Sequence, residues 1–232
     1  MNKIGLNSNQ LKLIAAVSML LDRVGYFLFP KILVFRIVGR LAFPIFAFCV
    51  AEGCRYTKNR LRYWLVMTGC AAVFQFVAIF SVGGIDAFSS ADTLFSVPIN
   101  IFGTFSVAIL ICFAFDGLKG RKFGGYLVFI LLVFAFYALS RYVEFDYGFV
   151  GMLVPLSVFV FTEKWPRFLL FTLTLAVLSS VGGWNVQYFA LVAVPILSLY
   201  QGQYGSKKYK YWFYVFYPLH LVLIYAVDFL IK

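Results

Sequence analysis

Charged side chains are scarce in this sequence. Asp, Glu, Lys and Arg make up 12% of its 232 residues, whereas 63% of the residues are hydrophobic. A soluble domain of this size could not cover so much apolar surface, so the composition excludes an ordinary soluble protein. The mean hydropathy of +0.92 is typical of an integral membrane protein. A membrane helix needs about 20 apolar residues, which leaves room for about nine or ten spans and little else.

Signatures of catalysis and metal binding are also lacking. The sequence contains no HExxH, no phosphate-binding P-loop, no GxSxG and no repeated set of cysteines and histidines. This disfavours metal-dependent hydrolysis, nucleotide hydrolysis and a serine triad. The four cysteines have no CxxC spacing and lie in or beside apolar runs, so we expect reduced packing residues and no metal site. We expect no cleavable signal peptide, because Asp22 and Arg23 interrupt the first apolar run.

Long apolar runs predict membrane-spanning helices, and polar breaks give their approximate limits. The runs are continuous rather than alternating, which disfavours a β-barrel. Since neither an internal repeat nor a linker is visible, we treat residues 1–232 as one all-α domain, a polytopic transmembrane helical bundle. The predicted spans are 11–29, 32–54, 63–82, 98–117, 124–142, 148–162, 168–181, 186–201 and 211–230.

The net charge of +11 follows this topology. With the N-terminus in the cytoplasm, 14 of the 20 Lys and Arg residues fall at cytoplasmic ends of the predicted spans, as the positive-inside rule requires. The basic excess therefore indicates a lipid bilayer as the partner and argues against nucleic acid. The 14 residues are Lys3, Lys12, Arg55, Lys58, Arg60, Arg62, Lys119, Arg121, Lys122, Lys164, Arg167, Lys207, Lys208 and Lys210.

Several ionisable residues lie inside the predicted spans, where each costs on the order of a few kcal/mol and normally faces a partner within the protein. Only residues 30–31 separate the first two spans, so these should form an antiparallel hairpin with Asp22 level with Gly39. Because Gly39 permits close helix approach, a pair between Asp22 and Arg40 is geometrically reasonable. Arg36 lies four residues before Arg40 and shares its helix face.

Two residues divide the second span. Pro44 cannot donate to the carbonyl of Arg40, which predicts a kink beside that arginine. Glu52 lies about 18 Å beyond Arg40 along a helix axis. We therefore expect Glu52 at the cytoplasmic mouth, together with the basic segments 53–62 and 119–122. Ordinary positive-inside bias explains those segments, and they would also suit a phosphate-bearing ligand from the cytosol.

His220 is the single histidine and lies near mid-membrane in the last predicted span, at a depth similar to that of Asp22. Two interpretations stay open for it: a neutral packing residue bonded to a carbonyl, or a proton acceptor. The charges at Asp22, Arg36 and Arg40 likewise form either a functional site or a buried ion network that fixes helix packing.

Motifs in the same order along nearly the whole chain resemble the TraX family, integral membrane proteins named for the F-pilin N-acetyltransferase of conjugation systems. They are LKLIAAVSMLLDRVG from Leu11, RIVGRLAFPIFAFCVAEGCRYTKNR from Arg36, NIFGT from Asn100, FDYGFVGML from Phe145, QYFALVAVPILSLYQGQYG from Gln187 and KYWFYVFYPLHLVLIY from Lys210. The resemblance implies a protein of the bacterial inner membrane that moves an acetyl group from cytosolic acetyl-CoA to an amine. The acceptor would be a pilin or peptide N-terminus or an amino sugar, and a glycan hydroxyl would suit the same cavity.

On this resemblance, we expect His220 to accept a proton and Asp22 to orient it or to pair with an arginine. Arg36 and Arg40 would stabilise the anionic thioester oxygen. The expected acetyl-CoA contacts are Glu52, Arg55, Lys58 and Arg60, and the expected substrate contacts are Asp146, Tyr147, Asn100 and Gln187. For Asn100 and Gln187, helix capping is the alternative. Where the family pattern has histidine after the aspartate, this chain has Arg23.

Two other classes of function use the same charges. A transporter or flippase would use them as a substrate or proton path, although no repeat supports it. A non-catalytic membrane subunit of a conjugation or secretion complex would use them only for packing.

Overall fold

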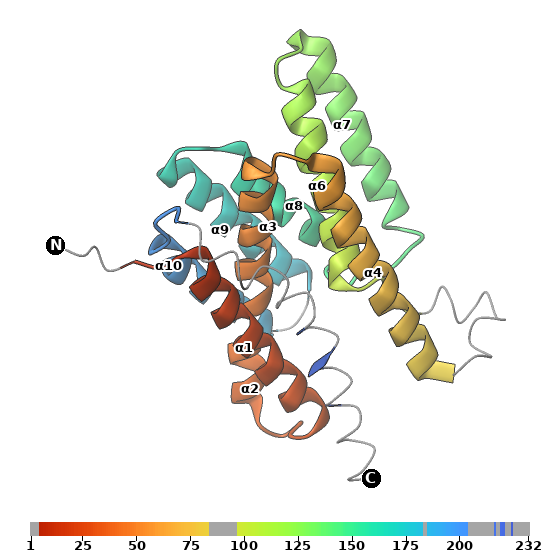
Figure 1. The fold of residues 1–232 in the computed structure, drawn as a ribbon, viewed down its shortest axis with the longest axis vertical. Coiled ribbons are helices and arrows are strands. Elements are labelled where there is room, and N and C mark those ends of the chain that lie inside the picture. The colour runs from red at the N-terminus through yellow and green to blue at the C-terminus, as the bar shows by residue number, and fades with distance from the viewer. Residues whose placement is uncertain are drawn as a thin grey trace. The chain divides into compact units, whose positions relative to one another are not determined.

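The computed structural model describes residues 5–83, 97–182 and 185–203, and the single positions 216, 219, 220 and 224. Helices form nearly all of this part of the chain, and its only β contacts are two isolated bridges, Leu6 with Tyr200 and Ile99 with Phe145. The predicted all-α class is therefore confirmed. The elements are α1 (Ser8–Phe27), α2 (Leu33–Gly39), α3 (Ala42–Tyr56), α4 (Arg60–Gly83), α6 (Ile101–Leu118), α7 (Lys122–Leu139), α8 (Gly148–Val160), α9 (Lys164–Val181), the 3-10 helix η2 (Asn185–Val192) and α10 (Ala193–Ser198) (Figure 1).

Three of these helical stretches are long and apolar enough to cross a membrane: Leu33–Tyr56, Arg60–Phe80 and Ile101–Leu118. Shorter apolar helices occupy Phe123–Leu139, Gly148–Val160 and Asn185–Ser198. The chain is thus a membrane protein, but the expected count of about nine or ten spans is not borne out. At 1.5 Å per residue the 13 residues of α8 extend about 20 Å, less than the hydrocarbon thickness of about 30 Å. The last predicted span, 211–230, lies outside the described residues except at positions 216, 219, 220 and 224.

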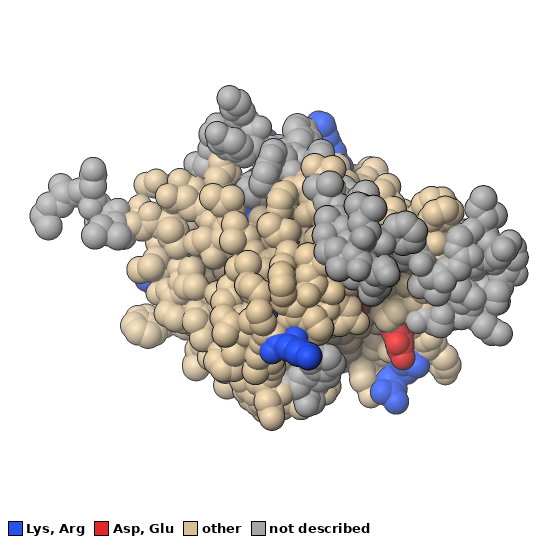
Figure 2. Space-filling view, turned by 90° about the horizontal axis from the view of Figure 1, so that it is seen from below, with Lys and Arg blue, Asp and Glu red and all other residues tan. Residues whose placement is uncertain are grey.

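The chain divides into two compact units, one made of Met1–Cys49 and Phe168–Lys232 and the other of Val50–Arg167. The division falls within α3 and within α9. On the face shown in Figure 2, most of the described surface is tan, the colour of uncharged residues, as expected for a membrane protein. Helix α7 likewise exposes large apolar side chains, including Ile130 at 62% and Phe134 at 64%. A soluble protein would bury such a face, whereas lipid tails cover it without cost.

In the first unit, α1 begins at a capping box. The side chain of Asn7 accepts hydrogen bonds from the backbone N–H groups of Asn9 and Gln10, and the Gln10 side chain accepts from the N–H of Asn7. These contacts satisfy donors that the first helical turn leaves without partners. Helices α1 and α2 then run antiparallel and side by side (Figure 1).

The predicted second span is broken rather than merely kinked. Helix α2 ends at Gly39 and α3 begins at Ala42. Pro44 lies in the first turn of α3, where its missing N–H is tolerated, and it cannot continue a helix through Arg40. Arg40 and Leu41 form the interruption, and each donates its N–H to the carbonyl three residues earlier.

In the second unit, α6 packs against α4, α7 and α8. Its side chains are buried on most sides, and Ile111 on α6 forms a core with Phe145 and with Met152 of α8. A hydroxyl–hydroxyl bond of 2.7 Å joins Thr68 of α4 to Ser106 of α6. Polar contacts of this kind hold helices together where lipid tails remove the hydrophobic drive between them.

Candidate functional site

Asp22 on α1 faces two arginines of the α2 segment. Arg36 Nη1 lies 3.5 Å from Asp22 Oδ1, and Arg40 Nη2 lies 3.9 Å from the same oxygen. The three side chains are only 14–16% exposed. The predicted pairing of Asp22 with Arg40 is confirmed, and Arg36 lies closer to the carboxylate than Arg40 does.

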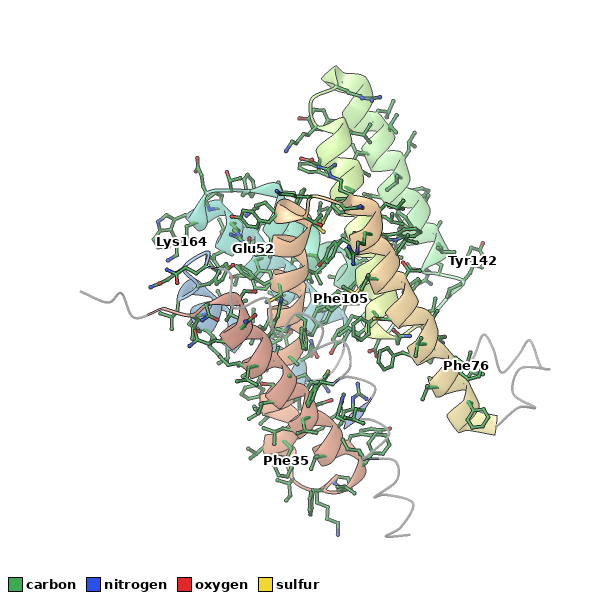
Figure 3. The ribbon with its side chains drawn as sticks, viewed as in Figure 1. Phe35, Glu52, Phe76, Phe105, Tyr142 and Lys164 are labelled. Atoms are coloured by element: carbon green, nitrogen blue, oxygen red, sulfur yellow. The ribbon has the colours of Figure 1, made fainter. Side chains whose placement is uncertain are left out.

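Glycine is what lets this carboxylate reach the neighbouring helix. A Cβ atom added at Gly39 would lie 2.3 Å from Asp22 Cβ, so no other residue fits there without a shift of the helices. Nearer the turn, a Cβ atom at Gly25 would lie 2.5 Å from the Cβ of Phe35, which Figure 3 labels. Small residues of this kind allow close packing between membrane helices, and the predicted level of Gly39 with Asp22 is confirmed.

A fourth side chain joins these charges from a distant segment. Arg40 Nη1 donates a hydrogen bond of 3.2 Å to Gln187 Oε1, which η2 carries against α2. The backbone carbonyl of Gln187 in turn accepts a 3.1 Å hydrogen bond from the buried Ser179 hydroxyl. Gln187 is 7% exposed. We call Asp22, Arg36, Arg40 and Gln187 the Asp22 cluster.

Arg23 stands at the edge of the Asp22 cluster. Its Nε lies 4.0 Å from Asp22 Oδ2, and its side chain is 33% exposed, about twice the exposure of Arg36 or Arg40. Arg36 additionally lies over the ring of Tyr26, at 5.2 Å from the centroid. Arg36 thus contacts both an aromatic face and the Asp22 carboxylate.

His220 is buried, at 4% exposure. Its Nδ1 lies 3.0 Å from the carbonyl oxygen of Phe216, and its ring stacks on the Phe216 ring at 5.2 Å between centroids. A carbonyl only accepts, so Nδ1 carries the proton and, in the neutral ring, Nε2 is the basic nitrogen. The carbonyl bond expected of a packing histidine is thus present, and it also leaves the ring in the tautomer that a proton acceptor needs.

In the second unit, Glu52 is buried and paired with two arginines. This residue, labelled on α3 in Figure 3, is 7% exposed and accepts hydrogen bonds at Oε1 from Arg55 Nη1 at 3.2 Å and from Arg167 Nη2. Burial lowers the pKa of the Arg167 guanidinium, while Glu52 opposes that shift. Arginine nonetheless stays charged in proteins, so one carboxylate here holds two cations.

Arg55 also caps the C-terminal end of α8. Its Nη2 donates to the carbonyl oxygens of Val158, Phe159 and Phe161 at 3.2, 3.1 and 2.8 Å. The last carbonyls of a helix have no partner within it and carry partial negative charge, so a guanidinium stabilises them. We call Glu52, Arg55 and Arg167 the Glu52 clasp. Its contacts link α3 to α8 and α9 and thus stabilise the packing of these helices.

The remaining expected cofactor contacts lie on the basic rim. Lys58 is exposed. Arg60, half exposed at the start of α4, pairs with Asp116 of α6, and Lys119 pairs with the other oxygen of Asp116 at 2.6 Å. The guanidinium of Arg60 also lies 5.1 Å from the centroid of the Phe113 ring. One acid thus places cations from two helices next to each other.

Of the expected substrate contacts in the second unit, Asn100 is a helix cap. Its side chain accepts from the N–H groups of Phe102 and Gly103 at the start of α6 and donates to Ala71 and Gln75 of α4. The capping alternative is therefore confirmed for this residue.

The backbone places the other two expected contacts of this unit beside it. Asp146 donates its N–H to the carbonyl of Ile99, immediately before Asn100, and Tyr147 is the N-cap of α8. Asn100, Asp146 and Tyr147 thus lie close together in the fold. Their role in substrate binding stays a prediction.

Arg167 and Asp116 were not among the expected site residues. Arg167 reaches Glu52 across 115 positions of the chain, and Asp116 reaches Arg60 across 56. The sequence held a weak signal for both residues. Asp116 is itself an acid among predicted cytoplasmic cations, and Glu52 is an acid that one of those cations, Arg167, could pair with.

Comparisons with known proteins assign the family. No solved structure is significantly similar to the chain. An uncharacterized protein of Rickettsia prowazekii (strain Madrid E), RP591, is 42% identical over 38 residues, which cover 16% of this chain and 15% of that protein. So short an overlap gives no basis for assigning a function. The family model described as TraX protein matches residues 7–228, nearly the whole length, and the chain therefore belongs to the TraX family.

Proposed function

We propose that this protein is an acetyltransferase of the bacterial inner membrane. It would move an acetyl group from cytosolic acetyl-CoA to an amine, such as a pilin or peptide N-terminus or an amino sugar, or to a hydroxyl. Membership of the TraX family fits a membrane protein associated with conjugation. The observation that carries the proposal is the Asp22 cluster, because ionisable groups in membrane-spanning segments are costly and mark functional sites.

The reaction needs two kinds of group from the protein, a proton acceptor and a cation that stabilises a negative oxygen. The acceptor nitrogen forms a bond to the thioester carbon, and the carbonyl electron pair moves onto its oxygen. That pair returns as the bond to sulfur breaks, and CoA leaves as the thiol. His220 would take the proton that the amine loses and deliver it to the sulfur. Arg36 and Arg40 would stabilise the oxygen while it is negative.

Lys58 and Arg60 are the best candidates for the CoA phosphates. Both are on the predicted cytoplasmic rim, Lys58 is exposed, and Arg60 has half of its side chain exposed. Glu52 and Arg55 are engaged with each other and with α8, so we assign them to the architecture that supports the rim. Their direct contact with acetyl-CoA stays a prediction.

A thermal-shift titration of the purified full-length protein with CoA and acetyl-CoA tests the donor half of this proposal. We expect both ligands to raise the melting temperature, and Lys58→Ala or Arg60→Ala to weaken binding by about two- to tenfold, as loss of one exposed charge-assisted hydrogen bond should. Lys31→Ala is the matched control, because it removes the same charge from an exposed residue on the predicted opposite side.

Acetyl transfer to a peptide amine, followed by mass spectrometry, tests the acceptor half. Absence of both CoA stabilisation and acetyl transfer would contradict the proposal and favour a non-catalytic subunit. Transport of a substrate across vesicles without CoA binding would favour the transporter class instead.

A further inference from the structure

Arg40 determines which way the Gln187 carboxamide is turned. A guanidinium has only donors, so the Gln187 atom that lies 3.2 Å from Arg40 Nη1 must be the amide oxygen. The amide nitrogen is then the other terminal atom of the group and carries two N–H donors. The orientation of this amide thus follows from the chemistry of its neighbour.

The Gln187 nitrogen is a buried donor. Within the part of the chain that the structure describes, Nε2 has no hydrogen-bond partner, and the residue is 93% buried on its exposure of 7%. Buried polar groups are nearly always satisfied, and leaving an N–H without an acceptor is costly. Gln187 is also held in place at its backbone by the Ser179 hydroxyl at 3.1 Å. A fixed donor without an acceptor, beside Arg40, indicates a ligand atom that accepts.

The character of the Asp22 cluster narrows that atom to an oxygen. Two guanidiniums share the single carboxylate of Asp22, so the cluster carries a net positive charge and favours an electron-rich oxygen beside the Gln187 N–H group. A carboxamide is neutral, and it can therefore hold an uncharged carbonyl oxygen before reaction. Its hydrogen bond strengthens as charge develops on that oxygen, which is how preorganised donors lower a barrier.

We propose that Gln187 donates a hydrogen bond from Nε2 to the carbonyl oxygen of the acyl group being transferred, next to Arg40. This assignment rests on the proposed acetyltransferase function. Gln187 neither gains nor loses a proton in the reaction. It holds the oxygen through addition of the amine and departure of the CoA thiol.

Gln187→Glu separates the two roles of this side chain. Glutamate has nearly the same shape, keeps an acceptor oxygen for Arg40 and adds a favourable charge pair with it, but it lacks the N–H donors. Tyr188→Phe is the control on the same 3-10 helix, because the Tyr188 hydroxyl hydrogen-bonds the Ser180 hydroxyl at 3.2 Å, and the Asp22 cluster does not include it. Both variants are measured in the full-length protein, with the melting temperature as a check on folding.

Turnover is the first measurement. We expect Gln187→Glu to lower kcat by about 100-fold, in line with loss of one oxyanion donor, with KM for acetyl-CoA changed far less. Tyr188→Phe should stay within about twofold of the wild type. A kcat for a folded Gln187→Glu protein within twofold of the wild type would overturn the assignment.

Binding is the second measurement, and it does not need turnover. S-ethyl-CoA differs from acetyl-CoA by lacking the carbonyl oxygen. We expect the wild type to prefer acetyl-CoA by about two- to tenfold, the size of one hydrogen bond, and Gln187→Glu to lose this preference. An unchanged preference in Gln187→Glu, or no preference in the wild type, contradicts this inference alone. A wild-type protein that binds neither ligand contradicts the proposed function and this inference with it.

Discussion

Replacing Asp22 by asparagine tests whether one carboxylate compensates both arginines of the Asp22 cluster. Asparagine keeps the size of the side chain and its approach to Gly39 but removes the charge that Arg36 and Arg40 face. Arg40→Gln is the companion variant, because it removes one cation and leaves the 3.5 Å pair between Asp22 and Arg36 in place.

The distances set the expected size of the effect. At an effective dielectric constant of about 20, unit charges 3.5 Å apart attract by about 4.7 kcal/mol and those 3.9 Å apart by about 4.3 kcal/mol. Desolvation of side chains that are 14–16% exposed offsets much of this attraction. Breaking a buried pair by removing one partner costs about 3–5 kcal/mol, and we expect that loss of unfolding free energy for Asp22→Asn.

Arg40→Gln should cost less, about 1–3 kcal/mol, because the carboxylate keeps Arg36. The double variant Asp22→Asn/Arg40→Gln should be more stable than the sum of the single losses by about 1–3 kcal/mol, as expected for residues in direct contact. Glu163→Gln, which removes an exposed carboxylate just before α9, is the control and should change stability by no more than about 0.5 kcal/mol.

Reversible unfolding of the purified protein in mixed detergent micelles measures these free energies, and acetyl transfer is followed in the same samples. Equal stability of Asp22→Asn and Arg40→Gln would refute the view that Asp22 compensates both arginines. Recovery of wild-type transfer in the double variant would show that the cluster serves packing alone and would refute its place in the proposed chemistry.

Three further outcomes are expected. His220→Ala should lower acetyl transfer by about 100-fold or more while the protein stays folded and monodisperse, because it removes the proton acceptor; normal turnover would exclude that role. Gly39→Ala should lower the unfolding free energy by about 1–3 kcal/mol, because its methyl group would lie 2.3 Å from Asp22 Cβ, and an unchanged melting temperature would argue against the close approach. Glu52→Gln should destabilise by about 3–5 kcal/mol and more than Arg167→Gln does, because it removes the carboxylate that two buried cations share; the reverse order, measured by thermal unfolding, would contradict the Glu52 clasp.

Local patterns predicted the features that depend on neighbouring positions in the chain. A two-residue turn and the regular rise of a helix place Asp22 beside Gly39, and a spacing of four places Arg36 and Arg40 on one face. Pro44 marked the irregularity in the second span. Its extent was underestimated, because a kink and a two-residue interruption at Arg40 and Leu41 begin from the same missing hydrogen bond.

Contacts between distant segments could not be predicted in the same way. The sequence predicted Glu52 at the cytoplasmic mouth, but it did not predict that Arg167 would pair with it. Asn100 had two open interpretations, a helix cap and a substrate contact. Its bonds from the N–H groups of Phe102 and Gly103 identify it as a cap, and its bond to Gln75 of α4 was not predicted. Arg167 and Gln75 lie on other helices, at positions that hydropathy and spacing do not specify.

Composition and hydropathy alone indicate an all-α membrane protein, because only helices and closed barrels satisfy their backbone in lipid, and the continuous apolar runs fit helices and not barrel strands. The order of motifs along the chain is enough to indicate the TraX family. Which donors meet at Asp22, and that Gln187 completes them, depends on how each helix is rotated and packed against the next. That rotation is set by the shapes of side chains far apart in sequence, and therefore only the folded chain brings Gln187 to Arg40.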